Sequence, residues 1–141
     1  MAQQLSVFLE NAPGRLSRLA RYLGDHDINM YALFVADTSD YGVARIICDK
    51  TEYAVQVLRE GGFSVTTTEV VAVEVPDRPG ALADLLEIIA KADIDISYSY
   101  CFIEPTTKNA VNVFRLRGNN AVCVIGDAGF RVLHDEDLLV S

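Results

Sequence analysis

The sequence predicts an α+β fold made of two tandem repeats, each with the ferredoxin-like order β-α-β-β-α-β. The main observation is an internal duplication. The stretch Leu9–Met30 (LENAPGRLSRLARYLGDHDINM) returns later in the chain as Val75–Ile96 (VPDRPGALADLLEIIAKADIDI), so that Pro13 corresponds to Pro79. In both copies a strand end, a Pro-Gly turn, an amphipathic helix and a strand start follow one another. The chain is therefore expected to fold as two similar halves.

The linker between the halves is almost absent. Only Thr68 and Glu69 separate the last strand expected in the first half from the first strand expected in the second. We therefore predict one repeat at residues 1–68 and another at 69–141, joined into one continuous antiparallel sheet with all four helices on one face.

Apolar residues recur at helical spacing after each Pro-Gly turn. The expected stripes are Leu16, Leu19, Ala20 and Leu23 in the first helix, and Leu82, Leu85, Leu86 and Ile89 in its counterpart. Gly24-Asp25 is expected to end the first of these helices.

The remaining elements follow from alternating and helical patterns. In the first half we expect strands Leu5–Glu10, Ile28–Asp37, Val43–Asp49 and Phe63–Thr68, a loop Thr38–Gly42, and a second helix Thr51–Glu60. In the second half we expect strands Val70–Val75, Ile94–Ile103, Ala110–Arg117 and Phe130–His134, a loop Glu104–Asn109, and helices Gly80–Ala92 and Asn120–Ile125.

Composition argues against several classes of function. The net charge is −8, and the basic residues are scattered, which disfavours nucleic acid as a partner. No apolar run is long enough to span a membrane, and the start MAQQLSV lacks the regions of a signal peptide, so a cytoplasmic protein is expected. The histidines His26 and His134 occupy unrelated positions, so we expect no metal site.

The strand after the second Pro-Gly helix gives a further argument against RNA. Its open face is expected to carry Asp95, Ser97, Ser99 and Cys101, whereas Tyr98, Tyr100 and Phe102 share the phase of Ile94 and Ile96 and are expected to pack on the helices. RNA-binding sheets instead present aromatic and basic residues on the open face. The three cysteines, Cys48, Cys101 and Cys123, are expected to be buried reduced thiols.

Catalysis would need a nucleophile or an acid–base pair with an orienting partner. Asp77, Asp93 and Asp95 are candidates for paired carboxylates, but helix capping and strand starts explain them more simply. No nucleophile, phosphate-binding loop or cofactor motif accompanies them. We therefore expect no catalytic residue, no cofactor and no enzyme activity.

The repeated turns, ENAPGRL and PDRPGAL, are the remaining candidate site. Each precedes a helix, so unpaired backbone N–H groups and the positive end of the helix dipole favour an anion such as a carboxylate. Asn11 or Asp77 could accept a hydrogen bond from an ammonium group. The alternative is that these residues only cap helices or form Asx-turns, with Pro-Gly as the turn.

At these residues the sequence resembles the ACT domain family of amino-acid-binding regulatory modules, as two tandem copies covering nearly the whole chain. The motifs that carry the resemblance are NAPGRL with DINM, and DRPGAL with DIDI. The resemblance implies that two copies pair through their first strands into an eight-stranded sheet. It also implies that a free amino acid binds between the turn of one copy and the second-strand start of the other.

The ligand-binding residues expected on this basis are Asn11, Ala12, Pro13, Gly14, Arg15, Leu16 and Asn29 in the first repeat, and Asp77, Arg78, Pro79, Gly80, Ala81, Leu82 and Asp95 in the second. Serine-sensing ACT copies carry Asn at both kinds of position. The first repeat keeps Asn11 and Asn29, whereas the second has Asp77 and Asp95.

Two functions remain. One is a regulatory or sensor module that binds a free amino acid and acts on a partner protein. The other is a structural interaction module with no small-molecule ligand.

The face of the sheet opposite the helices is expected to be apolar. It would carry Tyr31, Leu33 and Val35 in the first half, and Ile103, Val111 and Val113 in the second. Such a patch usually marks a contact surface. We therefore predict a homodimer through this face, or docking of the same face on a target enzyme.

Overall fold

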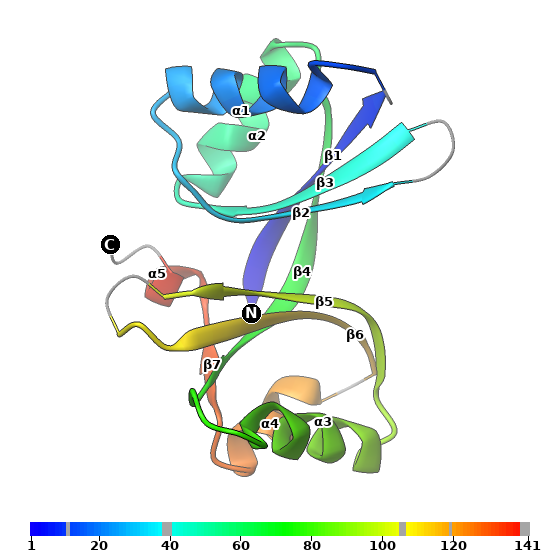
Figure 1. Ribbon diagram of the computed structural model, residues 1–141, viewed down its shortest axis with the longest axis vertical. Helices are drawn as coiled ribbons and strands as arrows, with labels where there is room; N and C mark the ends of the chain where they lie inside the picture. The colour runs from blue at the N-terminus through cyan, green and yellow to red at the C-terminus, as the bar shows by residue number, and fades with distance from the viewer. Residues whose placement is uncertain (11, 38–40, 105–106, 119, 139–141) are drawn as a thin grey trace. The chain divides into compact units, whose positions relative to one another are not determined.

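The computed structural model divides the chain into two units (Figure 1). We call Gln3–Thr68 the first repeat, and Glu69–Ser141 together with Met1–Ala2 the second repeat. The structure describes residues 1–10, 12–37, 41–104, 107–118 and 120–138. Parts of both expected hairpin loops, at 38–40 and 105–106, lie outside these residues.

Most elements agree with the sequence prediction to within a few residues. The first repeat contains β1 (Ala2–Glu10), α1 (Arg15–Asp25), β2 (Met30–Asp37), β3 (Tyr41–Cys48) and α2 (Thr51–Glu60). The strand β4 (Ser64–Val75) passes from the first repeat into the second. The second repeat continues with α3 (Ala81–Lys91), β5 (Asp95–Ile103), β6 (Ala110–Arg117), α4 (Ala121–Asp127), β7 (Arg131–Leu133) and α5 (Asp135–Leu138).

Both repeats have the same strand order. It is β2-β3-β1-β4 in the first repeat and β5-β6-β4-β7 in the second, so β4 is the last strand of one and the first strand of the other. The prediction of an α+β fold with two tandem ferredoxin-like repeats is confirmed. Two predicted strands, Phe63–Thr68 and Val70–Val75, are one strand in the structure. Two further predictions concern how the repeats are placed: that their first strands pair with each other, and that all the helices lie on one face. Both stay predictions.

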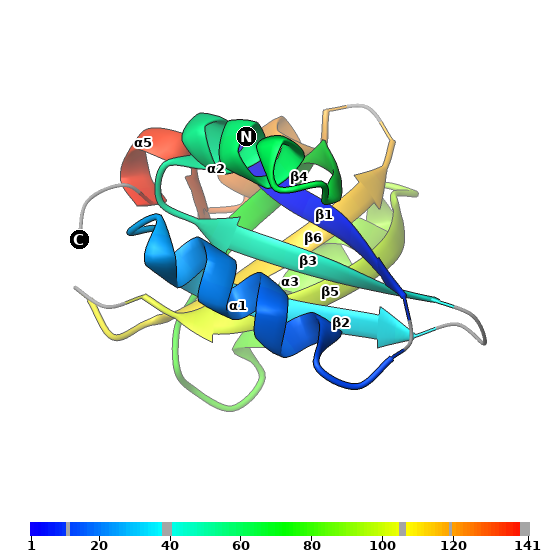
Figure 2. The same ribbon diagram turned by 90° about the horizontal axis from the view of Figure 1, so that it is seen from above.

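Helices α1 and α2 cover the same face of the sheet in the first repeat (Figure 1 and Figure 2). Leu5, Val7 and Leu9 of β1 face the helices as the sequence predicts, because side chains at every second position of a strand point to one face, although Gln4 and Ser6 on the other face are buried too. The side chains that face the helices form a buried cluster with the inner faces of both helices: Leu5, Val7, Leu9, Leu19, Leu23, Ala44, Ile46, Ala54, Val57 and Leu58.

The second repeat builds its core in the same way. Alternate residues of β4 and Phe114 of β6 pack against α3 and α4. The buried cluster contains Val71, Val73, Val75, Ala81, Leu85, Ile89, Ile94, Phe114, Ala121 and Ile125. Each repeat therefore has its own apolar core under its own pair of helices.

The first residue of each predicted helical stripe lies outside the core. Leu16 is 39% exposed and Leu82 is 43% exposed, whereas Leu19 and Leu85 are buried. Both exposed leucines lie in the first turn of their helices, directly after the Pro-Gly turns. The predicted stripes are therefore one turn too long at their N-terminal ends.

After the end of both α1 and α3, the chain turns at an aspartate in the left-handed conformation. Asp27 has φ 59° and Asp93 has φ 58°. The amide of Ile28 bonds to the carbonyl of Leu23 at 3.0 Å, which is the 6→1 bond of a Schellman motif. Helix α1 ends at Asp25, as expected from the pair Gly24-Asp25, with Gly24 as its last residue but one. The side chain of an aspartate tolerates this conformation better than most residues do.

A β-bulge occurs at the same place in both repeats. The strand register shifts between Met30 and Ala32 in β2, and between the corresponding residues Ile96 and Tyr98 in β5. A bulge adds one residue to one strand only, so the side chains after it lie on the face opposite to that expected from simple alternation. The sequence analysis assumed simple alternation along both strands.

The prediction that Tyr98, Tyr100 and Phe102 pack on the helices is therefore wrong. Tyr100 lies opposite Val113 in β6, the neighbour of the core residue Phe114. Neighbouring residues of a strand point to opposite faces, so these aromatic side chains lie on the face away from α3 and α4.

By the same register, two residues expected on the open face lie on the helix side. Ser99 is opposite the core residue Phe114, and Cys101 is opposite Asn112. The polar open face predicted for this strand is therefore wrong after Asp95.

The apolar patch predicted on the open face is also wrong in part. Leu33 lies opposite Ile46 and Val35 opposite Ala44, and both partners belong to the core under the helices. Leu33 and Val35 are exposed, but on the helix side of β2.

In the second repeat, Ile103 is opposite Ala110, which pairs with the core residue Val75. Ile103 is therefore on the helix side too. Val111 and Val113 do lie on the other face, as predicted, but both are fully buried. The residues named for the patch do not form one surface.

The cysteine prediction holds for one residue of three. Cys48 is buried, and burial raises its pKa to about 11. Cys101 and Cys123 are exposed. Within the described part of the chain, no helix combines the length and apolar character needed to cross a bilayer.

Two leucines of α3, one buried and one exposed, give a stability test. Leu85→Ala should lower the free energy of unfolding by about 2–5 kcal/mol, because Leu85 is fully buried in the core of the second repeat. Leu82→Ala, the same substitution at an exposed position of the same helix, should cost less than about 1 kcal/mol. Urea unfolding monitored by circular dichroism measures both. Equal losses would contradict the packing described for α3.

Candidate functional site

The turn of the second repeat has a defined hydrogen-bond pattern. The amide of Arg78 donates to the carbonyl of Pro76 at 3.0 Å, and the amide of Ala81 donates to that of Arg78 at 3.3 Å. Gly80, with φ 86°, then accepts the first helical bond from the amide of Asp84 at 2.9 Å. A positive φ is readily adopted by glycine, because it has no Cβ.

The first repeat contains the same pattern in its own Pro-Gly turn. The amide of Ala12 bonds to the carbonyl of Glu10 at 2.9 Å, and that of Arg15 bonds to Ala12 at 3.3 Å. Gly14 has φ 85° and accepts from the amide of Arg18 at 2.9 Å. The sequence duplication is thus a duplication of backbone geometry.

The two helices that follow the Pro-Gly turns, α1 and α3, each have a glycine at the N-cap position. Gly14 and Gly80 occupy these positions, and neither helix has a side-chain hydrogen bond at its cap. The reading of Asp77 as a helix cap is therefore wrong, since Asp77 lies before the N-cap Gly80 and outside the helix. Asn11 is outside the described residues. Among the described residues no side chain caps either helix, so the amides of the first helical turn that follow those of Arg15 and Ala81 are left for solvent or an anion.

The strand-start residues lie at the other end of each sheet. Both Asn29 and Asp95 are exposed, and the amide of Asn29 donates to the Asp49 carboxylate at 3.0 Å. In the first repeat β1 ends opposite Tyr41, the first residue of β3, whereas β2 begins opposite its last residue, Cys48. A strand of the length of β3, which has 8 residues, spans about 25 Å. One repeat alone therefore does not bring its turn and its strand start together.

The structure brings the other predicted site residues together within each turn. Ala12, Pro13, Gly14, Arg15 and Leu16 are consecutive and exposed. In the second repeat, Asp77, Arg78, Pro79, Gly80 and Leu82 are exposed, whereas Ala81 is buried in the core. Arg78 forms an ion pair with Asp84 at 3.4 Å, and an exposed pair of this kind contributes little stability.

A hollow lies beside each turn. In the second repeat it has a volume of about 590 Å³ and is lined by Glu74, Pro76, Asp77, Arg78, Asn109, Ala128, Gly129, Phe130 and Arg131. In the first repeat it has a volume of about 270 Å³ and is lined by Phe8, Leu9, Glu10, Arg15, Arg18, Gly62, Phe63 and Ser64. Both hollows are formed by the end of the first strand of the repeat and the chain after its second helix, joined by the turn in the second repeat and by the start of α1 in the first.

The hollow of the second repeat contains a polar network around Glu74. Its carboxylate accepts from the amide of the Asn109 side chain at 2.5 Å and from Arg131 at 2.9 Å. Thr107 also donates to it, at 3.5 Å. The hydrogen bond from Asn109, followed by the bond and charge of Arg131, holds the pKa of Glu74 below its ordinary value of 4.5. Arg131 also pairs with Asp137 at 3.7 Å.

The hollow of the first repeat has different chemistry. Phe8, the counterpart of Glu74 in the duplication, is 44% exposed. The guanidinium of Arg18 lies 4.6 Å from the ring centre of Phe63, a cation–π contact. Arg15 pairs with Glu10 at 3.2 Å. The turns are equivalent in backbone geometry, but their surroundings are not.

Sequence reasoning missed Glu74, Asn109 and Arg131. Glu74 had a weak signal, because it is the one charged residue in the run Val70–Val75. Asn109 and Arg131 lie 35 and 57 residues away from Glu74 along the chain, and only folding brings them to it.

Among the described residues, no group of three or more His, Cys, Asp or Glu side chains is placed to hold a metal ion.

These features define a tandem ferredoxin-like module with a duplicated strand–turn–helix. A family model described as the ACT domain pair matches residues 1–140. The chain belongs to the ACT domain family, as a pair of ACT repeats.

Solved structures agree with this assignment. The chain is similar to protein BT0572 from Bacteroides thetaiotaomicron, with 33% sequence identity, a TM-score of 0.90, and coverage of 99% of this chain and 96% of that one. It shares its fold with the regulatory subunits of aspartate kinase from Thermus thermophilus (13% identity, TM-score 0.63, 89% of each chain) and Thermus flavus (14% identity, TM-score 0.59, 89% and 91%). Among curated protein sequences, none matches this chain.

The glycines of α1 and of the turn before α3 should respond oppositely to alanine. Gly80→Ala should lower the free energy of unfolding by about 1–2 kcal/mol, because an L-residue is strained at φ 86° although its Cβ would meet no atom. Gly24→Ala, inside α1, should raise it by up to about 1 kcal/mol, since alanine is the better helix former. Denaturant unfolding measures both free energies of unfolding. An increase for Gly80→Ala would contradict the turn geometry.

Glu74 should contribute a pH-dependent part of the stability. A carboxylate whose pKa is lowered by folding stabilises the native state above its unfolded pKa, and this contribution is lost as the pH falls below about 4.5 and through the folded pKa. Glu74→Gln should therefore flatten the loss of stability below pH 4.5. Glu87→Gln, at an exposed site on α3, is the control. Urea titrations at a series of pH values test this, and parallel curves for wild type and Glu74→Gln would refute it.

Proposed function

We propose that this ACT domain pair is a cytoplasmic regulatory module that binds a free amino acid and acts on a partner protein. The observation that supports it most is the duplicated turn: each repeat presents uncapped helix amides behind a Pro-Gly turn, in a family of regulatory domains. Uncapped helix N-termini favour a carboxylate. The module is proposed to regulate rather than to catalyse.

The proposed ligand geometry uses one turn and the strand start of the other repeat. The α-carboxylate lies against the amides near Gly14 or Gly80. The ammonium group is accepted by side-chain oxygens, with Asn11 paired to Asp95 in one site and Asp77 to Asn29 in the other. Each site then has one carboxylate and one amide, so both can balance the charge of one ammonium group.

The turn and the strand start of one repeat lie at opposite ends of its sheet, and this separation is the physical reason for pairing residues from two repeats. Within the first repeat the turn and Asn29 are separated by the length of β3. A ligand of amino-acid size cannot bridge that distance, so a site that uses both kinds of residue needs a second repeat. The second repeat can come from the same chain or from another copy.

The partner is proposed to be a target enzyme or a second copy of the chain. The structures of similar fold include proteins named as regulatory subunits of aspartate kinase, which are regulators in their own systems. Light scattering over a concentration series tests the homodimer. A mass of 15.5 kDa at every concentration would count against it.

A thermal-shift screen against the standard amino acids tests ligand binding. A ligand at one hundred times its dissociation constant should raise the free energy of unfolding by about 2.7 kcal/mol. The carboxamide of the same amino acid should bind far more weakly, because it lacks the charge that the helix end favours. Equal binding of acid and amide would refute the proposed orientation.

Substitutions in one site should weaken binding together. Asp77→Ala and Asn29→Ala should each reduce the affinity of the same site, whereas Asp25→Ala, an exposed position on α1, should not. Calorimetric titration with the amino acid found in the screen measures this. If no amino acid shifts the melting temperature, the chain is instead a structural interaction module without a small-molecule ligand.

A further inference from the structure

The helices that follow the two Pro-Gly turns, α1 and α3, each leave an apolar stripe open. Residues four apart in a helix lie on one face of it. The stripes occupy duplicated positions, Leu16, Ala20 and Gly24 in α1 and Leu82, Leu86 and Ala90 in α3. The middle residue of each stripe is half-buried, and the outer two are exposed. Each helix therefore has an apolar side that its own repeat does not fully bury.

The stripe of α1 lies on the side turned away from α2. Arg18 donates to the carbonyl of Gly61 at 3.3 Å, and Tyr22 donates to that of Val57 at 2.6 Å. These two residues mark the side of α1 that faces α2. Ala20, two residues from each, lies on the opposite side, because two residues turn a helix by about 200°. Figure 2 shows α1 over the β2 side of this sheet and α2 over the β4 side, so the stripe adjoins the edge strand β2.

The stripe of α3 has the same place in the second repeat. Helix α4 contacts both α3 and β7, and β7 is at the opposite end of the strand order β5-β6-β4-β7 from β5. Helix α3 therefore covers the β5 side of its sheet. Because its stripe occupies the positions of the stripe in α1, it adjoins the edge strand β5.

The edge strands extend both stripes. Leu33 and Val35 of β2 are exposed on the helix side of the first sheet. Their duplicated counterparts in β5, Ser99 and Cys101, are exposed on the helix side of the second. In the described sheet, β2 and β5 are the two end strands, so each has a free edge. We define the first lateral surface as Leu16, Ala20, Gly24, Leu33 and Val35, and the second lateral surface as Leu82, Leu86, Ala90, Ser99 and Cys101.

The two lateral surfaces are complementary in size. The first has small residues on its helix and large ones on its strand, and the second has the reverse. The equivalent pairs are Ala20 and Leu86, Gly24 and Ala90, Leu33 and Ser99, and Val35 and Cys101. Two first surfaces placed together would leave a gap at Ala20, and two second surfaces would be overfilled at Leu86, and both arrangements pack poorly. A first surface placed on a second one matches large side chains with small ones.

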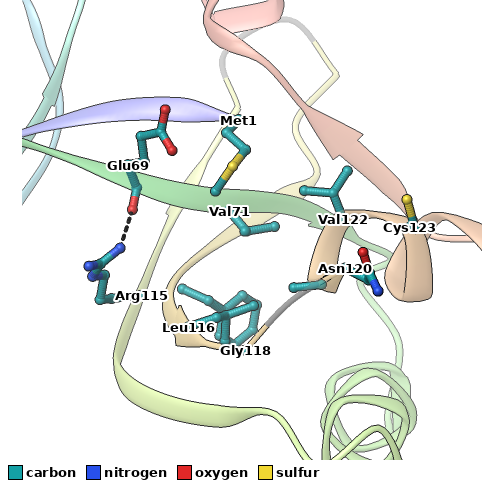
Figure 3. Close-up of a pocket in the computed structure, with 11 residues that line it drawn as sticks. Met1, Glu69, Val71, Arg115, Leu116, Gly118, Asn120, Val122 and Cys123 are labelled. Atoms are coloured by element: carbon teal, nitrogen blue, oxygen red, sulfur yellow. Dashed lines mark hydrogen bonds between the residues drawn. The ribbon is translucent and has the colours of Figure 1, made fainter.

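The lateral surfaces are not small-molecule hollows. None of their residues lines the hollows beside the two turns. None lines a third hollow of about 300 Å³ in the second repeat either, whose walls include Val71, Leu116 and Val122 (Figure 3). An exposed apolar surface outside a hollow is typical of a contact with another protein surface.

The proposed amino-acid site sets the direction of such a contact. Helix α1 begins after Gly14 of its turn and ends shortly before Asn29 of its strand start. Helix α3 has the same arrangement between Gly80 and Asp95. A turn can lie beside the strand start of the other repeat only when the start of one helix lies beside the end of the other. The contact between α1 and α3 is therefore antiparallel.

An antiparallel contact centred on Ala20 and Leu86 brings each large residue of the stripes against a small one. The pairs are Ala20 with Leu86, Leu16 with Ala90, and Gly24 with Leu82. Side chains four apart form the ridges through which helices commonly pack. A Cβ placed on Gly24 would meet no atom within 4 Å beyond its neighbours in the helix, so the space beside it is open to a leucine.

The charges above this contact match as well. Arg21 follows Ala20 on α1, and Glu87 is its duplicated counterpart on α3. Both are exposed, and in the described part of the chain neither forms an ion pair. Each lies one residue beyond the centre, so the two are about 3 Å apart along the helix direction. Two first surfaces would instead bring Arg21 against Arg21, and two second surfaces Glu87 against Glu87, which disfavours both pairings.

We propose that a second copy of this chain covers both lateral surfaces: the first surface of each copy lies against the second surface of the other, with α1 and α3 antiparallel. The direction of the helices rests on the proposed amino-acid function, whereas the matching of size and charge does not. Each chain has one surface of each kind, so a two-fold axis gives a closed dimer with two identical contacts. Each contact places the first turn beside Asp95 of the other copy, and the second turn beside Asn29. The second copy thereby completes the proposed amino-acid sites.

Charge exchange tests which surfaces meet. Light scattering over a concentration series, without amino acid, gives the mass and the dissociation constant of the dimer, and the wild type should reach twice 15.5 kDa. Arg21→Glu and Glu87→Arg should each raise this dissociation constant about tenfold, because each places like charges in both contacts. The double variant exchanges the two charges and should return it to within about threefold of the wild-type value. An equal mixture of the two single variants should dimerise like the wild type, since opposite charges then meet in both contacts.

A packing variant tests the match in size. Gly24→Leu should raise the dissociation constant of the dimer about a hundredfold, because two leucines then occupy the same place in both contacts. Asp25→Leu is the matched control, since it puts the same side chain on the next exposed residue of α1, outside the lateral surface, and should leave the dissociation constant unchanged. Circular dichroism checks that both variants are folded.

Three results would overturn the proposal: a wild-type mass other than that of a dimer, single charge variants that dimerise as tightly as the wild type, or a double variant that dimerises no better than either single one. Amino-acid binding is a separate outcome. A dimer with these properties that binds no amino acid would overturn the proposed function and leave the contact in place. An amino acid bound by a monomer of 15.5 kDa would keep the function and overturn the contact.

Discussion

Hydrogen bonding along β4 is the constraint on which the rest of the structure depends. Every backbone N–H and C=O group of a buried strand needs a partner. The strand is bonded to β1 as the last strand of the first repeat, and to β6 and β7 as the first strand of the second. The chain enters the second repeat without leaving the extended conformation, so a linker of almost no length is enough. Each set of strands then buries one face under its own two helices.

The repeated bulge is the feature that decides what each sheet presents to its surroundings. It occurs in β2 and, at the duplicated position, in β5. After the bulge in β5, Tyr98, Tyr100 and Phe102 are turned from the helix side to the other face. Because the bulge is duplicated together with the turn and the aspartate helix ends, it is part of the architecture of both repeats and not a local irregularity.

The two repeats keep the same backbone but differ in their side chains. The hollow beside the second turn has an ionised network around Glu74, whereas the first has Phe8 and a cation–π contact at the corresponding place. Duplication therefore provided two equivalent frameworks, and substitution at a few lining positions gave the two hollows different side chains.

The sequence by itself determined the order of elements, the duplication and the position of the turns. These depend on local patterns: apolar spacing, the Pro-Gly pair, and the constant offset that relates Pro13 to Pro79. Of the candidate site, it identified the turns and strand starts, and their joint role stays a prediction. Only the tertiary structure decided which face the side chains after each bulge occupy, because one inserted residue reverses the alternation without changing the composition. It also decided which distant residues meet, as Glu74, Asn109 and Arg131 do. A hydrogen bond between residues far apart in the chain forms only when folding brings their strands and turns to the same end of one sheet.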